Sequence, residues 1–413
     1  MDTFIQIKRT SVLKGEASLL PASKSISNRA LIINALAGGT STLSNLSDAN
    51  DTQLMLKLVG SKDKTIDVED AGTTMRFLTA FFSVTDQNKI LTGTSRMKER
   101  PIGLLVDALR KLGVEINYLE KDGFPPHEIK KFSGQTTDSI HIRGDVSSQY
   151  ISALMMIAPI LPKGLKLVLE GKIGSRPYIE MTAALMNHFG VNVKLMPASV
   201  EIAHQTYKPA PFTVESDWSA ASYWFAFTAL AEKAEIILPK LLSDSLQGDS
   251  AIVKIMEGLG VKSEFKNGLL TLTKIPSKNE LHWDFTHCPD LAQTVAVVCA
   301  AKNIKGYFIG LESLRIKETD RIQALQNELE KIGAGLIEQD SEHWTLVPTP
   351  SLPASASFLT YKDHRMAMAF APLATLMDVE IERPEVVRKS YPNFWNDMKT
   401  LGFSVQSSFN VLK

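Results

Sequence analysis

The sequence of 413 residues lacks the features of several specialised protein classes. It has only two cysteines, Cys288 and Cys299, which form no CxxC or zinc-ligand spacing and no disulfide framework. No apolar run reaches about 18 residues. The opening MDTFIQIKRT has the pattern of neither a signal peptide nor an Arg- and Ser-rich transit segment. These absences predict a soluble protein of the reducing cytoplasm.

The sequence also has no excess of charge of either sign, with 45 Lys and Arg against 45 Asp and Glu. A balanced charge argues against a general basic field for nucleic acid or an anionic membrane surface. Neither partner is expected. Any anion site must therefore come from a local concentration of cations.

Several common catalytic and nucleotide-binding motifs are missing. The sequence has no GxxxxGK[ST] and no GxGxxG after a strand. It has no GxSxG or HExxH either, so a serine hydrolase or a zinc protease finds little support. His287 and Cys288 are adjacent in the segment HCPD and make a poor zinc pair.

An internal repeat organises the chain. Amphipathic helical segments recur, each ending at a glycine that suits a helix C-terminal cap and each followed by a short alternating strand. The six glycines are Gly60, in a degenerate copy, and Gly113, Gly190, Gly260, Gly333 and Gly402. Their spacing of 53 to 77 residues is too long for a solenoid and suits a small α/β unit.

A second type of helical segment is apolar on all sides, which is typical of helices buried in a large protein. The six segments are NRALIINALAG, TTMRFLTAFFSV, SSQYISALMMIAPIL, SAASYWFAFTALA, DLAQTVAVVCAA and HRMAMAFAPLATLM. One buried and one amphipathic helix per unit predict two lobes of three units each, with a ligand cleft between the lobes.

Cations stand where helices are expected to begin. Lys24, Arg29 and Arg365 precede or open buried helices, and Lys317 and Arg321 open an amphipathic helix. Capping by Ser, Thr or Asp explains the polar residues at any one start. It does not explain cations at the positive end of a helix dipole, where burial without a partner is costly. Helix N-termini and guanidinium groups together favour a phosphate or carboxylate site.

Eight segments, in order along the whole chain, resemble the 5-enolpyruvylshikimate-3-phosphate synthase family of enolpyruvyl transferases. They are PASKSISNRAL, DAGTTMR, GTSRMKERPIGLLVDAL, GDVSSQY, GSRPYIE, IKETDR, YKDHRMAMAF and RKSYPNFW. The resemblance implies an α/β (α+β) fold with two similar lobes, each of three βαβαββ units with buried central helices. Lobe one would combine residues 1–22 with 216–413, and lobe two would span 23–215.

The resemblance also implies the reaction. The enolpyruvyl group of phosphoenolpyruvate is transferred to the 5-hydroxyl of shikimate 3-phosphate through a tetrahedral intermediate, with release of phosphate, on the pathway to chorismate and aromatic amino acids. No metal or organic cofactor is needed. The implied contacts to shikimate 3-phosphate are Lys24, Ser25, Arg29, Ser147, Ser148, Gln149, Ser175, Asp290, Ser313 and Lys317. Those to phosphoenolpyruvate are Lys24, Gly72, Arg100, Gln149, Arg321, Arg365 and Lys389.

Three residues are implied to carry the chemistry. Asp290 is the candidate base at the 5-hydroxyl, and Glu318 is the candidate that protonates the methylene carbon and later removes a proton. The sequence leaves open which carboxylate serves which half-reaction, and both are expected to be required. Lys24 can bridge both substrates and act as an acid towards phosphate. Arg76 is interpreted as a brace of the fold, and Asp363 as a helix cap.

The sequence departs from the family pattern at four positions at or near these residues. Ala22 stands for a usual glycine, Asp70 for asparagine and Phe77 for proline, and Ser313 stands where the family often has asparagine. The retained Gly72 predicts room for the inhibitor glyphosate. Asp70 and Phe77 leave the strength of inhibition open.

Two other functions compete with this one. The related transferase that acts on UDP-N-acetylglucosamine usually has asparagine after the first lysine and often a cysteine in the mobile loop. Here Ser25 follows Lys24, and the loop TSRMKERPIG has no cysteine. A non-catalytic anion-binding relative would have no use for Asp290 and Glu318. A monomer is the default expectation.

Overall fold

The computed structural model describes residues 3–145 and 147–409. Val146, in the motif GDVSSQY, lies outside the described residues. The chain divides into two compact units. Unit 1 comprises Met1–Ala22 and Glu215–Lys413, and unit 2 comprises Ser23–Val214. Within the described ranges, no helix has the length and apolar character needed to cross a membrane.

Unit 2 contains two four-stranded sheets, each built as βαβαββ. The first has the strand order β4-β5-β7-β6, and the second has the order β10-β11-β9-β8. In both, the first two strands in sequence are parallel and the closing hairpin is antiparallel. The elements of the first are β4 (Thr65–Asp67), α3 (Gly72–Val84), β5 (Lys89–Thr92), α4 (Ser95–Lys98), α5 (Gly103–Lys111), β6 (Val114–Tyr118) and β7 (His127–Phe132). Those of the second are β8 (Ser139–Arg143), α6 (Ser148–Ile157), β9 (Leu165–Glu170), α7 (Arg176–His188), β10 (Lys194–Met196) and β11 (Ser199–Ile202).

The third repeat of unit 2 is reduced. Its helices α1 (Lys24–Leu36) and α2 (Asn50–Leu58) are present, but its sheet has only β3 (Leu43–Ser44) and β12 (Phe212–Thr213), paired in parallel. The expectation of three full βαβαββ units is therefore wrong for this repeat. The chain passes from α2 directly to β4 without a hairpin, which explains the short interval between Gly60 and Gly113.

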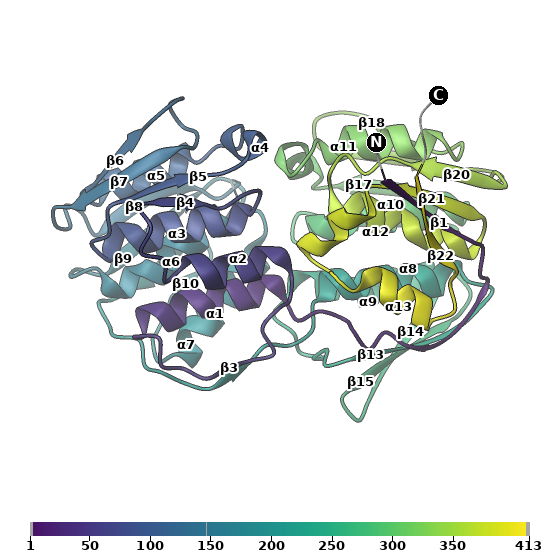
Figure 1. Ribbon diagram of the computed structural model, residues 1–413, viewed down its shortest axis with the longest axis horizontal. Coiled ribbons are helices and arrows are strands. Elements are labelled where there is room, and N and C mark those ends of the chain that lie inside the picture. The colour runs from purple at the N-terminus through teal and green to yellow at the C-terminus, as the bar shows by residue number, and fades with distance from the viewer. Residues whose placement is uncertain (1–2, 146, 410–413) are drawn as a thin grey trace. The chain divides into compact units, whose positions relative to one another are not determined.

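Unit 1 contains three four-stranded sheets with the orders β14-β15-β13-β2, β16-β17-β19-β18 and β20-β21-β1-β22. The N-terminal strand β1 pairs antiparallel with both β21 and β22, so the purple start of the chain lies among its yellow end in Figure 1. The strands are β1 (Thr3–Ile7), β2 (Val12–Glu16), β13 (Lys233–Pro239), β14 (Val261–Lys266), β15 (Leu269–Lys274), β16 (Glu280–Asp284), β17 (Lys305–Ile309), β18 (Gly335–Glu338), β19 (His343–Val347), β20 (Ser355–Phe358), β21 (Asp378–Glu382) and β22 (Val405–Phe409).

The helices of unit 1 are of the two predicted types. The buried helices are α8 (Trp218–Leu230), α10 (Ala292–Ala301) and α12 (His364–Phe370). The amphipathic helices are α9 (Ile252–Leu259), α11 (Arg321–Glu330) and α13 (Phe394–Thr400). In α8 every residue except Ser219 is buried, so this helix has no solvent face. Each buried Leu, Ile, Val or Phe side chain stabilises the fold by about 1.5–3 kcal/mol.

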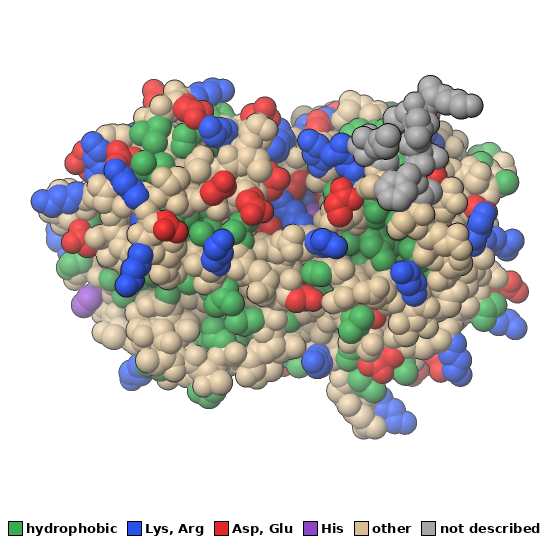
Figure 2. Space-filling model, viewed as in Figure 1, with side chains coloured by type: hydrophobic (Ala, Val, Ile, Leu, Met, Phe, Trp, Pro, Cys, Tyr) green, Lys and Arg blue, Asp and Glu red, His purple; other side chains and the backbone are tan. Residues whose placement is uncertain are grey.

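The predicted glycine caps are confirmed at five of the six positions. Of the six predicted caps, the five with positive φ are Gly113, Gly190, Gly260, Gly333 and Gly402. Glycine adopts this left-handed conformation at little cost, so it can end a helix there. Gly60, in the degenerate copy, does not have positive φ. On the face shown in Figure 2, acidic and basic side chains are interspersed, as the balanced charge predicts.

Candidate active site

Most of the site residues predicted in unit 1 take part in one network of ion pairs. Asp290, at the short helical turn Pro289–Leu291 before α10, lies at its centre. Its Oδ1 atom is 3.0 Å from Nη1 of Arg321 and 3.7 Å from Nζ of Lys317. Its Oδ2 atom accepts a hydrogen bond of 2.9 Å from Nη2 of Arg365. Three cations, two at or just before the start of α11 and one from α12, thus hold one carboxylate.

Glu318 joins the same network from the segment before α11. Its Oε2 atom is 2.8 Å from Nη2 of Arg321, and its Oε1 atom is 3.6 Å from Nζ of Lys389. The two candidate acid–base carboxylates, Asp290 and Glu318, are therefore joined through one guanidinium. All these charges are largely shielded from solvent, which strengthens their interactions relative to surface pairs.

Asp320 and Asp363 explain why cations are tolerated at the starts of α11 and α12. Asp320 caps α11 by accepting from the backbone N–H groups of Ile322 and Gln323. Asp363 caps α12 and also accepts from Nε of Arg321 at 2.7 Å. The predicted cap at Asp363 is confirmed, and its second role as a partner of Arg321 was missed. Arg321 is only 2% exposed, so without these carboxylates its burial would be very costly.

The cations fix the charge of Asp290. Burial alone would raise the pKa of its carboxyl group, but Arg365, Lys317 and Arg321 outweigh burial and hold the pKa well below the ordinary value. In the same way, Asp363, Glu318 and Asp290 outweigh the effect of burial and raise the pKa of Arg321. Asp290 is ionised at neutral pH.

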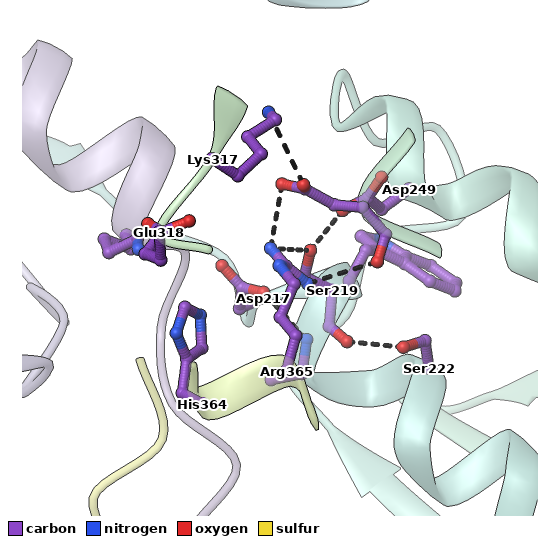
Figure 3. A network of polar contacts seen from close by, with 12 residues as sticks. Asp217, Ser219, Ser222, Asp249, Lys317, Glu318, His364 and Arg365 are labelled. Atoms are coloured by element: carbon purple, nitrogen blue, oxygen red, sulfur yellow. Dashed lines mark hydrogen bonds and ion pairs between the residues drawn. The ribbon is translucent and has the colours of Figure 1, made fainter. Parts of the chain in front are cut away.

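Arg365 has further partners that sequence reasoning missed. Its Nη2 atom also donates to Oγ of Ser219 at 3.1 Å, and its Nη1 atom donates to the hydroxyl of Tyr223 at 3.4 Å. Ser219 in turn donates to Oδ2 of Asp249 (Figure 3). Asp249 follows a strand by ten residues and carries no helix periodicity, so only the packing of the short turn Gly248–Ala251 against α8 places it here.

Unit 2 holds a buried arginine with no carboxylate partner among its described contacts. Arg29 is 2% exposed, and its guanidinium donates to Oγ1 of Thr182 at 2.7 Å, Oγ of Ser152 at 2.9 Å and the carbonyl of Ser25 at 2.9 Å. It also lies over the ring of Phe77, 5.2 Å from the centroid. Burial lowers the pKa of Arg29 to about 10. A buried cation held only by neutral groups suits a site that takes an anion.

Arg100 is a second such cation and stacks on Gly72. A Cβ atom built on Gly72 would lie 2.7 Å from Nη2 and 2.9 Å from Cζ of Arg100. Nε of Arg100 is buried without a hydrogen-bond partner in the described chain. Arg76 donates to the carbonyls of Gly72 and Pro101, which is the bracing role that its position predicts. Arg76 thus holds the carbonyl of Gly72, while the Arg100 guanidinium occupies the space that a side chain at Gly72 would fill.

The remaining predicted residues of unit 2 surround the starts of α1, α6 and α7. Nζ of Lys24 is 3.3 Å from Oδ2 of Asp51, a partner that the sequence did not indicate. Ser147 caps α6, and Gln149 donates to Oγ1 of Thr73 at 3.1 Å. The others are Ser25, which is half-buried, Ser148, which is buried, and Ser175, which precedes α7 with φ of 53°.

Ser313 stands apart from the network in unit 1. It is half-buried in the turn Glu312–Ile316 and forms no side-chain hydrogen bond with another described residue. No group of three or more His, Cys, Asp or Glu residues in the described ranges is arranged to hold a metal ion.

Comparison with known proteins places these residues in a family. The family model of EPSP synthase (3-phosphoshikimate 1-carboxyvinyltransferase) matches residues 7–61 and 59–398. The chain is 48% identical over 397 residues to a 3-phosphoshikimate 1-carboxyvinyltransferase of Bacteroides fragilis, covering 94% of this chain and 95% of the relative. It is 35% identical to the enzyme of that name from Shewanella woodyi, with 96% and 99% covered. The chain belongs to the EPSP synthase family.

The fold agrees with that membership. A solved structure of EPSP synthase from Acinetobacter baumannii matches with a TM-score of 0.79 at 20% identity, covering 99% of this chain and all of the other. At this identity the match concerns the fold, which is two-lobed. EPSP synthases are transferases of the shikimate pathway, so the expected family, fold and enzyme class are confirmed.

Two departures from the EPSP synthase pattern have structural consequences. Phe77 lies against Arg29, as described above, and so contributes to holding that cation. Asp70 is exposed and accepts a hydrogen bond from Thr94, the residue that caps α4. Asp70 is thus tied to the start of the loop that carries Arg100.

Proposed function

We propose that this protein transfers the enolpyruvyl group of phosphoenolpyruvate to the 5-hydroxyl of shikimate 3-phosphate and releases phosphate. The observation that carries the proposal is the cluster in unit 1 of two carboxylates, Asp290 and Glu318, with four cations. These cations are Lys317, Arg321, Arg365 and Lys389. A cluster of this kind can bind an anion and move protons at the same place.

The binding roles follow the charges. Both substrates carry a carboxylate and a phosphate, and unit 2 offers Arg29 and Arg100, which have no carboxylate partner among the described residues. We assign the contacts to shikimate 3-phosphate as Lys24, Ser25, Arg29, Ser147, Ser148, Gln149, Ser175, Asp290, Ser313 and Lys317. Phosphoenolpyruvate is assigned to Lys24, Gly72, Arg100, Gln149, Arg321, Arg365 and Lys389.

The proton transfers are assigned to Asp290 and Glu318. An anionic substrate draws Arg321 and Arg365 away from Asp290 and so makes this carboxylate a better base. Asp290 then takes the proton of the 5-hydroxyl as its oxygen bonds to C2 of phosphoenolpyruvate, while Glu318 protonates the methylene carbon. In the second half of the reaction the C2–phosphate bond breaks, and Glu318 removes a methyl proton to restore the double bond. The departing phosphate, assisted by Lys24, takes up the proton that Asp290 removed from the hydroxyl, so both carboxylates return to their starting state.

The test is phosphate release on mixing the protein with phosphoenolpyruvate and shikimate 3-phosphate, with UDP-N-acetylglucosamine as a parallel acceptor. Release with shikimate 3-phosphate alone is expected. Asp290→Asn and Glu318→Gln are each expected to lower kcat by at least about 100-fold, since general acid–base groups contribute about 10²–10⁴-fold. Glu312→Gln, an exposed glutamate close by in sequence, is the matched control and is expected to leave kcat unchanged.

The other outcomes are distinct. Release only with the sugar nucleotide would place the chain in the related branch of enolpyruvyl transferases. Stabilisation by shikimate 3-phosphate without any release of phosphate would indicate a binding protein without chemistry.

We further propose that the enzyme is cytoplasmic and that it acts as a monomer. The sequence contains no exposed heptad repeat that would favour an assembly. Size-exclusion chromatography with light scattering tests the oligomeric state.

A further inference from the structure

A chain of contacts leads from a buried acid to Arg365. Asp249 is 3% exposed, and its Oδ2 atom accepts a hydrogen bond from the hydroxyl of Ser219. The same hydroxyl oxygen accepts from Nη2 of Arg365 at 3.1 Å. Figure 3 shows Ser219 lying between Arg365 and Asp249. Ser219 is the residue of α8 that is not buried, so this contact lies at the edge of the core.

Arg365 needs this anchor if it binds a substrate. Its guanidinium contacts Oδ2 of Asp290 at 2.9 Å and the carbonyl of Asp290 at 3.3 Å. An anionic ligand on Arg365 competes with the Asp290 carboxylate for the same N–H groups. Once that ion pair is exchanged, Ser219 and Tyr223 are among the side chains that still hold the guanidinium.

Asp249 is poised between two charge states. Its Oδ1 atom is buried and has no hydrogen-bond partner in the described chain, which disfavours the ionised form. Burial first, and then the nearby Asp290, raise the pKa of Asp249 to about 7, while Arg365 and Ser219 oppose this rise and Asp217 adds to it. The neighbouring Cys288 thiol stays neutral, because burial raises its pKa to about 12.

We propose that Asp249 is a positioning residue that acts through Ser219 on Arg365, and that ionisation of Asp249 weakens the use of phosphoenolpyruvate. This role rests on the proposed function. The ionised acid adds a negative charge three hydrogen bonds away from an anion bound to Arg365, roughly 9 Å at about 2.9 Å each. At an effective dielectric constant of about 20, the repulsion corresponds to roughly a 20-fold loss in kcat/KM for phosphoenolpyruvate.

The first test compares kcat/KM for phosphoenolpyruvate in wild type and Asp249→Asn from about pH 5.5 to about pH 8.5, a range that brackets this ionisation. Ionisation of the substrates is the same for both proteins and cancels in the ratio. The ratio of variant to wild type is expected to rise about 20-fold with a midpoint near pH 7. Asp244→Asn removes an exposed carboxylate in the same loop and is expected to give a ratio that does not change with pH.

The second test is Ser219→Ala, which keeps the Asp249 carboxyl group and removes its link to Arg365. Loss of a hydrogen bond to a charged group predicts an increase of about tenfold or more in the KM for phosphoenolpyruvate, with the KM for shikimate 3-phosphate unchanged. This variant decides the matter if Asp249→Asn does not fold.

The outcomes separate this role from the proposed function. An inactive wild type would overturn the proposed function and this role together. An active wild type with a ratio that is constant with pH would overturn this role alone. So would a Ser219→Ala variant whose KM for phosphoenolpyruvate stays within about twofold of wild type, since a lost charged hydrogen bond predicts more.

Discussion

Gly72→Ala is expected to impair the use of phosphoenolpyruvate while leaving the fold intact. The added Cβ atom would lie 2.7 to 2.9 Å from three atoms of the Arg100 guanidinium. Ordinary contacts between heavy atoms are about 3.5–4.0 Å, so the guanidinium must move by roughly 0.7 Å or more. Because it is the end of a flexible side chain, this movement costs little stability. Alanine also favours a helix over glycine by up to about 1 kcal/mol.

The same movement is costly for a ligand. A displacement of about 1 Å in a positioned group can cost on the order of 100-fold in rate, so kcat/KM for phosphoenolpyruvate is expected to fall by about 10- to 100-fold. The KM for shikimate 3-phosphate is expected to remain unchanged. Steady-state phosphate release and thermal unfolding measure the two effects. Gly60→Ala, where the new methyl group meets open space, is the control.

Two results would refute this reasoning about Gly72. One is a folded Gly72→Ala variant whose kcat/KM for phosphoenolpyruvate is within about twofold of wild type, well short of the effect of a 1 Å displacement. The other is a free energy of unfolding of Gly72→Ala that is several kcal/mol lower than that of wild type. This would mean that the residues around Arg100 do not let its guanidinium move.

Three further predictions concern other parts of the chain. His127 is buried, its Nδ1 atom has no partner in the described residues, and burial lowers its pKa to about 3 from 6.5. Below pH 6.5 the unfolded state therefore binds a proton on His127 that the folded state does not bind. The free energy of unfolding should then fall by up to about 1.4 kcal/mol for each unit that the pH drops. Chemical denaturation of wild type and His127→Gln should diverge in that range, and parallel curves would contradict the assignment. Arg29→Met should change the free energy of unfolding by no more than about 1 kcal/mol, because it leaves no buried carboxylate without its partner. The same variant should bind shikimate 3-phosphate about 100-fold more weakly in a thermal-shift titration. A large loss of stability with unchanged affinity would instead mean that Arg29 has a structural role. Glyphosate should inhibit competitively with phosphoenolpyruvate, and no effect at millimolar inhibitor would show that Asp70 or Phe77 closes the space beside Gly72.

Much of the fold could be predicted from the sequence because its signals are local. A helix that is apolar on all sides, such as SAASYWFAFTALA, has only one place in a large protein, and α8 is buried as expected. A glycine after an amphipathic helix fixes the helix end through its own backbone freedom, as at Gly260. The short interval between Gly60 and Gly113 indicates that the first unit has lost strands or loops, and the two-stranded sheet of β3 and β12 confirms this. The sequence did not show which strands are missing, because the segment after Gly60 looks like another strand of the same unit. Only strand pairing shows that this strand, β4, belongs to the next sheet.

The charged types needed at the candidate site could also be read from the sequence, together with the resemblance that assigns them roles. Their partners could not. Arg29 meets Thr182, 153 residues away, and Asp290 meets Arg365, 75 residues away. Asp249 reaches Arg365 only through Ser219 on another helix. The sequence by itself determined which residues are charged, which helices are buried and where those helices begin. The tertiary structure alone decided which carboxylate neutralises which cation, because that depends on how separate helix ends pack together and not on any period along the chain.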